Sequence, residues 1–488
     1  GEYWSKAIWL FHDSPTLTEA FLQKYYDSMI LQAEHIMECH SAYRYMSNWG
    51  VIENHGLFEI GVCLPQSEKT KQFIAFAVKN LEVQVRMQIM PDGVHWEQSP
   101  MYHNEVLHCL LDVILLAKRN GIALPDVILR QTEKMAMADV AWLKPDHHIV
   151  MMGDSDDVDV RDRISVAAYL FLNPVLRFGG FDRLDYESIW DLGMKAGEEY
   201  AVMERRKPDF TSLFLEHSGN TYFRSDWSER ANFLHLHSGT MGAGHGHSDK
   251  LHIDLVVNGE DVLMDGGRYT YVSGPKRFSY KDPSGHNTIT VDDLPFTVCK
   301  DSWECSKLSQ PVKENFRCME LAEFAQAGQL GYMDLPGGVY VNRKVVYIKP
   351  DLYILVDEMY TGDCHTYQQY FHFNNHGAVT LTAPGEKKFP CVAYRGKMAE
   401  ADFYFVSAQV KAELKRGHIA RHYNVEEENT VCKVTKPGDG FTSLITVIDA
   451  HPGRPLSIEK LPVRSALKQT DYPETMAEAL KITTGEKE

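Results

Sequence analysis

Residues 242–267 read GAGHGHSDKLHIDLVVNGEDVLMDGG, and this stretch decides the fold of the second half of the chain. A loop rich in glycine and histidine leads into the apolar run 251–258, and Asn258-Gly259 separates that run from a second one. Asn-Gly between two apolar runs is the pair that a two-residue β-hairpin turn favours. The stretch therefore predicts two antiparallel strands joined by a tight turn, with Asp265 on the returning arm near the start of the pair.

Further strands are predicted on both sides of this hairpin. Short runs with strand composition and alternation recur along the second half of the chain. They cover residues 220–224, 232–237, 287–291, 339–348, 352–356 and 368–373. We expect these runs to form an antiparallel β-sandwich over residues 206–385, followed by a smaller all-β module over residues 386–488.

The first 205 residues carry the helical period instead. Apolar residues recur at helical spacing over residues 16–40, 67–89, 99–119, 127–143 and 162–172. Helix pairs that recur at intervals of a few tens of residues are typical of stacked α-hairpins, as in a solenoid or toroid. The sequence pattern changes near residues 205–208 from helical spacing to short runs with strand composition. Helices first and strands afterwards predict an α+β protein with separate domains.

Bulk composition excludes several classes of function. The 488 residues carry a formal net charge of −17, which argues against general nucleic-acid binding because the chain would repel phosphate. No apolar run is long enough to span a membrane. The nine cysteines are scattered and form no CxxC pair, so we expect most of them to be reduced and buried. They favour a cytoplasmic location; no signal peptide is visible, and a periplasmic or secreted location would follow if one had been removed.

Other familiar motifs are absent or incomplete. The chain has no GxSxG, the glycines near residue 244 do not open a helix after a strand, and residues 35–40 place glutamate wrongly for a zinc-protease motif. The acidic residues Asp154, Asp156, Asp157 and Asp159 lack the glycine and terminal glutamate of a calcium loop. We expect them to form a solvated acidic loop.

Two histidines and a carboxylate converge around the predicted hairpin. His245 and His247 are two positions apart and share a face in an extended segment, while His286 opens the next predicted strand. Two of these histidines together with the Asp265 carboxylate would form a plausible zinc-binding set. The alternative is that they are hydrogen-bonded core histidines.

Two segments of the helical half also carry candidate site residues. Ser99 and Pro100 suit a helix start, which would place Tyr102 in the first turn next to a loop. The stretch 46–56 lies between the predicted helices and contains Asn48, Trp49 and His55. Packing of aromatic residues and helix capping by asparagine are the ordinary alternatives for these positions.

In this order, these features resemble the heparinase II/III family of lyases. The matching motifs are Asn48-Trp49, Glu97-x-Ser99-x-x-Tyr102-His103, residues 244–249 with Asp265-Gly266-Gly267-x-Tyr269, and His286-Asn287-Thr288-Ile289-x-Val291. The resemblance implies an α/α toroid, here incomplete because the helical half is short, followed by antiparallel β-sheets. It also implies cleavage of uronate polymers by β-elimination and, in several members, a structural zinc ion.

The resemblance assigns roles by position. It makes Asn48 the group that neutralises the substrate carboxylate, Tyr102 the catalytic tyrosine and His245 the second acid/base group. It makes His247, Asp265 and His286 the zinc ligands. Tyr102 follows Asn48 by 54 positions, which suits the family, but many members carry histidine at or beside this asparagine, so His55 is the alternative neutraliser.

Other residues complete the expected site. Arg224 or His245 would make Tyr102 more acidic, and Trp49 and Glu97 would contact an acidic poly- or oligosaccharide. Two alternatives differ in class. A glycoside hydrolase would pair Glu97 with Asp249 or Asp265, and a non-catalytic carbohydrate-binding protein would keep the aromatic residues but tolerate the loss of the Tyr102 hydroxyl.

Overall fold

The computed structural model describes residues 2–382, 388–474 and 476–485. These residues form two compact units. The helical unit consists of Gly1–Ala141 and Asp159–Pro208, and the β unit consists of Trp142–Val158 and Asp209–Glu488. The short segment Trp142–Val158 therefore belongs to the β unit, although helices lie before and after it in the sequence.

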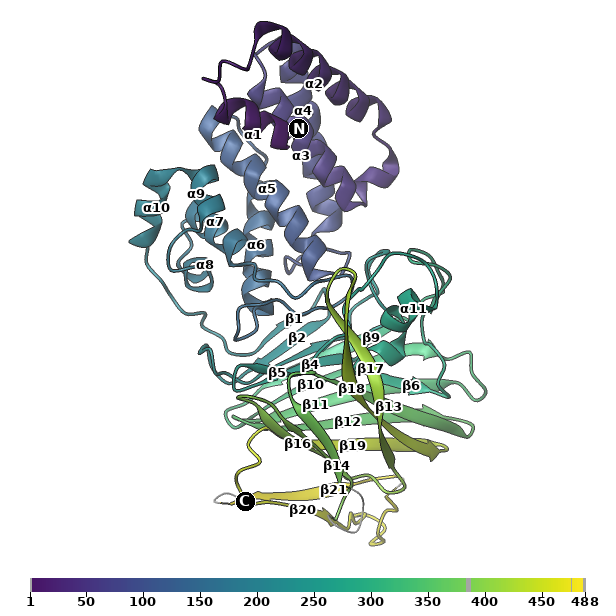
Figure 1. The fold of residues 1–488 in the computed structure, drawn as a ribbon. Helices are drawn as coiled ribbons and strands as arrows, with labels where there is room; N and C mark the ends of the chain where they lie inside the picture. The colour runs from purple at the N-terminus through teal and green to yellow at the C-terminus, as the bar shows by residue number, and fades with distance from the viewer. Residues whose placement is uncertain (1, 383–387, 475, 486–488) are drawn as a thin grey trace. The chain divides into compact units, whose positions relative to one another are not determined.

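The helical unit contains long helices followed by short ones (Figure 1). The bounds are α1 (Glu2–Leu10), α2 (Glu19–Cys39), α3 (Asn48–Cys63), α4 (Glu68–Gln88), α5 (Pro100–Asn120), α6 (Asp126–Trp142), α7 (Arg161–Phe171), α8 (Pro174–Gly179), α9 (Tyr186–Leu192) and α10 (Met194–Ala201), with a 3₁₀ turn η1 (Ala42–Tyr45) before α3. The five helices expected from hydrophobic spacing are confirmed as α2, α4, α5, α6 and α7.

Helix α3 was not expected, and the interpretation of residues 46–56 as a segment between helices is wrong. Asn48 is the first residue of α3, after Ser47, whose side chain accepts a hydrogen bond from the backbone N–H of Trp49. The helix is buried on nearly every side and packs against α1, α2, α4 and α5. A helix surrounded by other helices has no polar face, so the amphipathic period that identifies a surface helix is absent.

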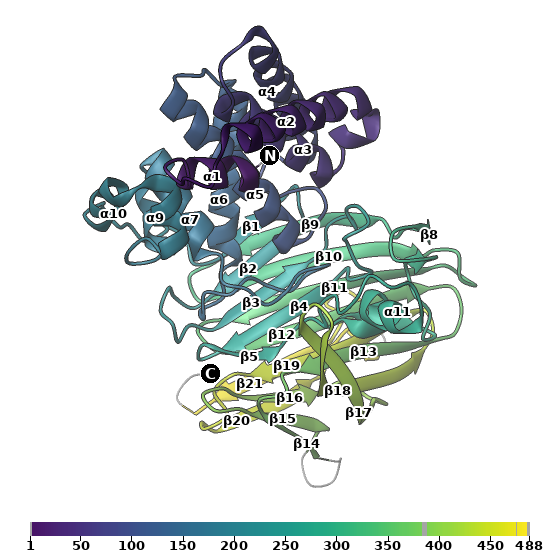
Figure 2. The ribbon, with the colours of Figure 1, turned by 45° about the horizontal axis from the view of Figure 1, so that its top comes forward.

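The β unit contains two large antiparallel sheets (Figure 2). The first has the order β1-β2-β3-β4-β5-β13-β18-β17, with β6 beside β13. Its strands are β1 (Leu213–Leu215), β2 (Asn220–Arg224), β3 (Phe233–His237), β4 (His252–Val257), β5 (Glu260–Leu263), β6 (Ile289–Val291), β13 (His365–Phe373), β17 (Lys411–His422) and β18 (Val425–Gly438).

The second sheet has the order β14-β15-β16-β19-β12-β11-β10-β9. Its strands are β9 (Pro311–Cys318), β10 (Ala322–Tyr332), β11 (Val339–Ile348), β12 (Leu352–Thr361), β14 (Ala378–Thr382), β15 (Cys391–Arg395), β16 (Glu400–Phe405) and β19 (Phe441–Asp449). Two small hairpins join β7 (Val298–Cys299) to β8 (Cys305–Lys307) and pair β20 (Leu456–Leu461) with β21 (Ala479–Thr484).

One apolar core lies between the two large sheets. Leu234 and Leu255 of the first sheet belong to the same buried cluster as Val341 and Phe403 of the second. The expected β-sandwich is therefore confirmed. Strands before and after residue 385 pair within the same sheets, as β12 does with β19 and β13 with β18. The chain therefore forms two compact units, whereas three domains were expected.

The predicted hairpin with its turn at Asn258-Gly259 is also confirmed. β4 pairs with β5, and Asn258 and Gly259 both take positive φ angles, of 49° and 80°, as a type I′ turn requires. After β5 the chain passes through α11 (Pro275–Lys281) and the 3₁₀ turn η2 (Pro283–Gly285) before β6. His286 therefore comes directly after η2, next to the open end of the hairpin.

Candidate active-site residues and metal cluster

The loop that carries His245 and His247 is held by close backbone contacts. A Cβ atom on Gly246 would lie 1.5 Å from the carbonyl oxygen of Met241, so only glycine fits at this position. The backbone N–H of Ser248 donates to the Lys281 carbonyl at 2.9 Å, which ties the loop to α11. The glycines of this segment thus allow the loop to fold tightly enough to present both imidazoles on one side.

Both imidazoles meet the carboxylate of Asp154. His245 Nδ1 lies 3.0 Å from Asp154 Oδ2, and His247 Nε2 lies 2.8 Å from Asp154 Oδ1. The Arg277 guanidinium lies 2.6 Å from the same carboxylate. Burial alone would raise the pKa of Asp154, but the hydrogen bonds from the two histidines and the Arg277 charge hold it well below its usual range. Asp154 is therefore a buried anion that positions both rings.

The expectation of a solvated acidic loop is wrong for this residue and for its neighbour Asp156. Asp154 is fully buried, and Asp156, 8% exposed, accepts two hydrogen bonds from the Arg268 guanidinium at 2.7 and 2.8 Å. Both carboxylates reach basic groups that lie about a hundred positions away in the sequence. Nothing in the local composition indicates these partners, because they depend on the packing of the segment Trp142–Val158 within the β unit.

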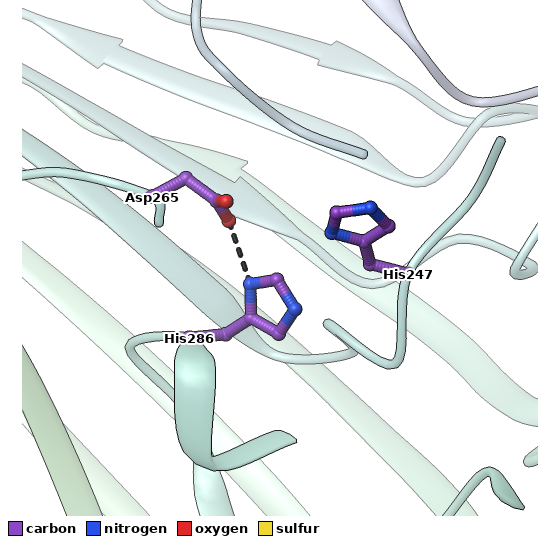
Figure 3. Close-up of side chains that lie close together, drawn as sticks. All are labelled: His247, Asp265 and His286. Atoms are coloured by element: carbon purple, nitrogen blue, oxygen red, sulfur yellow. Dashed lines mark hydrogen bonds and ion pairs between the residues drawn. The ribbon is translucent and has the colours of Figure 1, made fainter. Parts of the chain in front are cut away.

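His247, Asp265 and His286 form a fully enclosed triad (Figure 3). One ligand atom from each of the three residues lies within 4.8 Å of the others, and His286 Nδ1 is 2.8 Å from Asp265 Oδ2. Burial lowers the pKa of His247 to about 3, so its imidazole is neutral and keeps a lone pair for a metal. The triad could hold a metal ion.

The hydrogen bonds around the triad fit this role. Within the described residues, His247 Nδ1 and His286 Nε2 are buried without a hydrogen-bond partner. Such atoms are costly unless something binds them. His247 meanwhile has its other nitrogen on the Asp154 carboxylate, which is the arrangement that orients histidine ligands in metal sites. The chemistry of the three residues therefore suits zinc.

In the helical unit, Asn48 is bound by Glu97. The backbone N–H of Asn48 donates to Glu97 Oε1 at 3.2 Å, and its side-chain Nδ2 donates to Glu97 Oε2 at 2.8 Å. Both residues are nearly fully buried, at 2% and 3% exposure. Glu97 lies three positions before the start of α5, so these bonds hold the N-terminal ends of α3 and α5 together.

Tyr102 lies in the first turn of α5, as expected, and is half-buried. The next residue, His103, points into the helical core, where its Nδ1 accepts from the His95 backbone N–H at 3.2 Å and its Nε2 lies 3.1 Å from the Met135 carbonyl. Burial lowers the pKa of His103 to about 3. The helix start is therefore anchored by His103, and Tyr102 is the more accessible of the two.

His55 occupies a second buried cluster of the helical unit. Its Nε2 lies 3.0 Å from Asp112 Oδ2 and 3.8 Å from Glu59 Oε2. These three residues could also hold a metal ion. The Lys6 ammonium lies 3.4 Å from Asp112 and already supplies positive charge there. His55 is 2% exposed, as Asn48 is, so burial does not separate these two candidates for the group that neutralises a substrate carboxylate.

Two further candidates differ in exposure. Trp49 is 57% exposed, with the Arg44 guanidinium 5.2 Å from its ring centre. Arg224 is 3% exposed; its guanidinium donates to the Leu143 carbonyl and lies over the ring of Trp227 at 4.2 Å. Burial lowers the pKa of Arg224 to about 9.

The structure thus groups the candidates in two sets. Asn48, Glu97 and Tyr102 belong to the helical unit, and His245 with the metal triad belongs to the β unit. Sequence reasoning missed Asp154, Arg277 and Asp112. Each is a charged residue whose partners lie far away along the chain.

Comparison with known proteins identifies the family. Residues 3–174 match the family model of the heparinase II/III N-terminus, and residues 207–454 match that of the heparinase II/III-like C-terminal region. The chain therefore belongs to the heparinase II/III family.

Individual relatives are more distant. The chain is 26% identical over 315 residues to the heparin-sulfate lyase of Pedobacter heparinus, a match that covers 60% of this chain and 43% of that protein. It is 20% identical to the heparin-sulfate lyase of Bacteroides stercoris over 87% of this chain and 62% of that protein. The chain thus matches about half of the length of these curated relatives.

Solved structures share the fold. The crystal structure of heparinase III superposes with a TM-score of 0.79 at 17% identity, covering 99% of this chain and 73% of that one. Heparan sulfate lyase HepC from Pedobacter heparinus superposes with a TM-score of 0.74 at 19% identity, covering 98% and 71%. The protein has the heparinase III-like combination of a helical toroid-type region and a β-sandwich. In the described residues, no helix combines the length and apolar character needed to cross a membrane.

Proposed function

We propose that this protein is a polysaccharide lyase that cleaves a uronic-acid-containing glycan by β-elimination and leaves a C4–C5 unsaturated uronate end. Membership of the heparinase II/III family supports the reaction class. The observation that carries the proposal is the bonding of Asn48 to Glu97 beside the helix start that holds Tyr102. The curated relatives are heparin-sulfate lyases, which supports an acidic poly- or oligosaccharide as the substrate.

Asn48 is the proposed neutraliser of the substrate carboxylate. Removal of the C5 proton places negative charge on the neighbouring carboxylate as an enediolate, and a fixed donor stabilises that charge where it develops. The Nδ2 of Asn48 carries two hydrogens, of which one goes to Glu97 at 2.8 Å, so the other can be donated to the substrate. Glu97 fixes the orientation of the amide. We prefer Asn48 to His55 because His55 is bonded to Asp112.

Tyr102 and His245 are the proposed acid/base residues. When the C5 proton and the C4 oxygen lie on the same face of the ring, the Tyr102 phenolate takes the proton, the C4–C5 double bond forms, and the tyrosine protonates the leaving C4 oxygen. When they lie on opposite faces, His245 is the base. Donation of its Nδ1–H to Asp154 at 3.0 Å leaves the lone pair on Nε2, the nitrogen that accepts a proton.

A zinc ion bound by His247, Asp265 and His286 has a structural role in this proposal. Bound there, it fixes the loop that carries His245. The three ligands come from the loop before β4, the segment after β5 and the residue after η2, so they join the open end of the hairpin to its neighbours. Arg224 and Trp49 remain proposed substrate contacts.

The deciding experiment follows the far-ultraviolet absorbance of an unsaturated uronate during incubation with a panel of uronate oligosaccharides and polymers. We expect a signal with one substrate class and its loss in Tyr102→Phe. Hydrolysis would give new reducing ends without that absorbance, and would then point to Glu97 with Asp249 or Asp265 as a carboxylate pair. Binding of a panel member without cleavage by the wild type, unchanged in Tyr102→Phe, would indicate a carbohydrate-binding protein.

A further inference from the structure

The cysteines differ from the sequence-based expectation. All nine are free thiols, but only Cys109, Cys391 and Cys432 are buried, so the expectation that most are buried is wrong. Cys299 and Cys305 are half-buried and face each other across the β7–β8 hairpin. They are paired residues in the strand register, and their Sγ atoms lie 3.2 Å apart.

This geometry suits a disulfide. An S–S bond is about 2.05 Å long, so the two sulfur atoms need to approach by only about an ångström. Directly opposed residues of an antiparallel pair have Cα atoms about 4.5–5.5 Å apart, within the range of about 4.4–6.8 Å that a disulfide spans. Because both cysteines are half-buried rather than enclosed, a small external disulfide can reach them.

The hairpin also contacts the loop of His245. Trp303, in the turn between the two cysteines, has its ring centre 5.3 Å from that of His245, in an edge-to-face contact, and stacks on Tyr271 at 5.0 Å. The buried Lys281 ammonium donates to the Ser302 carbonyl at 2.9 Å and to the Gly244 carbonyl at 2.6 Å. One lysine therefore ties the residue before Trp303 to the residue before His245.

We propose that Cys299 and Cys305 form a reversible disulfide that closes the β7–β8 hairpin and holds Trp303 against His245. The oxidant is a small-molecule disulfide such as oxidised glutathione. The Cys305 thiolate attacks one of its sulfur atoms and expels a thiolate; Cys299 then attacks Cys305 Sγ and expels the second. Two protein thiols are oxidised, one disulfide is reduced, and the two protons end on the released glutathione thiols.

The local charges favour this order of attack. A hydrogen bond from the Cys299 thiol, together with the nearby Lys281 charge, lowers the pKa of Cys305, although partial burial opposes the shift. The same hydrogen bond and burial raise the pKa of Cys299. Cys305 is thus the better nucleophile, because the thiolate is the reactive form.

The test uses the whole protein, equilibrated with either reduced or oxidised glutathione and then alkylated, digested with trypsin and analysed by mass spectrometry. Cleavage after Lys300 separates the two cysteines, so a disulfide shows as two peptides that remain joined and have lost two hydrogen atoms. We expect this product with oxidised glutathione and its disappearance on reduction. Cys299→Ser should instead retain a glutathione adduct at Cys305, the first nucleophile, and an adduct is also expected at the exposed Cys364 of the wild type.

Alkylation of Cys299 and Cys305 to the same extent in both buffers would overturn the disulfide. The effect on the hairpin is measured by amide hydrogen exchange over residues 298–307, where oxidation should slow exchange roughly tenfold. Equal exchange in the two redox states would overturn the restraint on Trp303.

The consequence for catalysis rests on the proposed function. The oxidised protein should show a kcat about twofold or more above that of the reduced protein, with KM little changed, because Trp303 keeps the His245 ring in place. This difference should vanish in Cys305→Ser. If no uronate is eliminated in either redox state, the proposed function fails while the joined peptides still establish the disulfide.

Discussion

Glu97 and Asp154 are carboxylates that each hold candidate site residues through two hydrogen bonds. Glu97 accepts both the backbone and the side-chain N–H of Asn48, and Asp154 accepts from His245 and His247. Neither carboxylate can be replaced by its amide without turning one acceptor into a donor that faces another donor. Charge-assisted bonds of this kind are about twice as strong as neutral ones, so the two residues position their partners firmly.

Substitution at Asn48 and Glu97 should separate the direct role from the positioning role. We expect Asn48→Ala to lower kcat by about 10²–10³, because one donor to the developing charge is lost. Glu97→Gln keeps Asn48 but misorients its amide, so kcat should fall less. Steady-state kinetics in the absorbance assay measure both changes, with circular dichroism to verify folding. An Asn48→Ala variant with wild-type kcat would remove Asn48 from the mechanism.

Asp154→Asn should destabilise the β unit strongly. The change leaves the fully buried Arg277 guanidinium without its anion, and breaking a buried pair in this way costs about 3–5 kcal/mol in the free energy of unfolding. The matched control is Asp159→Asn, whose carboxylate is 27% exposed and pairs with Arg161, and which should cost less than about 1 kcal/mol. Urea unfolding compares the two variants; equal costs would contradict a structural role for Asp154.

At the scale of the element, the open end of the β4–β5 hairpin carries the metal triad and the loop of His245. The turn at Asn258-Gly259 sets the register of the two strands. The glycine loop before β4 and the η2 turn before β6 then bring His247 and His286 to Asp265. The element therefore depends on tight backbone packing as much as on the three side chains.

Gly246→Ala should disturb this loop. The new methyl group would lie 1.5 Å from the Met241 carbonyl oxygen, so the backbone must move and the imidazoles on both sides must shift. We expect loss of metal binding and a destabilisation of about 1–3 kcal/mol, which is typical of overpacking. Gly453→Ala is the matched control, because a methyl group there meets open space. Thermal melts of the two variants give the comparison; a wild-type melting temperature for Gly246→Ala would show that the loop relaxes freely.

Bound metal should be lost on substitution of the triad in the β unit. We expect elemental analysis to find zinc in the wild type and in Glu59→Gln, and to find none in His286→Ala. Chelation should lower the melting temperature of the wild type, since a ligand at a hundredfold excess over its Kd stabilises the folded state by about 2.7 kcal/mol. If Glu59→Gln loses the metal and His286→Ala keeps it, the ion belongs to the cluster of His55, Glu59 and Asp112.

At the scale of the whole molecule, the interior of the β unit contains several buried carboxylates. Burial would raise the pKa values of Asp154, Asp254 and Asp265, but their histidine and arginine neighbours lower all three below the usual value. A carboxyl group with a lowered pKa in the folded state stabilises the fold above its unfolded pKa of about 3.9. That stability is lost as the pH falls through the folded pKa.

Acid should therefore unfold the protein, and the contribution of a single residue can be followed. We expect the free energy of unfolding to fall from about pH 5 downwards. Asp254 bonds to His235 at 3.0 Å and to His252 at 3.2 Å, so Asp254→Asn should be less stable than the wild type at pH 7, and the gap should narrow towards pH 3. Urea titrations across this range provide the measurement. If the stability difference between the two proteins widened as the pH fell, it would contradict the lowered pKa of Asp254 in the folded state.

Local periodicity determined much of the fold in advance. Alternation with period 2 and spacing with period 3.6 report which side of an element is apolar, and they identified α2, α4 to α7 and the β4–β5 hairpin. The motif order identified His247, Asp265 and His286 as a set, and the structure brings these three together. Helix α3 was not predicted because it is buried on nearly every side, so it carries no amphipathic period.

The sequence by itself therefore determined the order of helices and strands, the hairpin turn and the residue types of the candidate site, because these depend on neighbours in the chain. Only the tertiary structure decided that Asp154 meets His245, 91 positions away, that Glu97 binds Asn48, and that His55 is enclosed with Asp112. It also decided that strands on both sides of residue 385 share their sheets. The physical reason is that a buried charge is stable only beside its partner, and packing of distant segments, which no local pattern records, selects that partner.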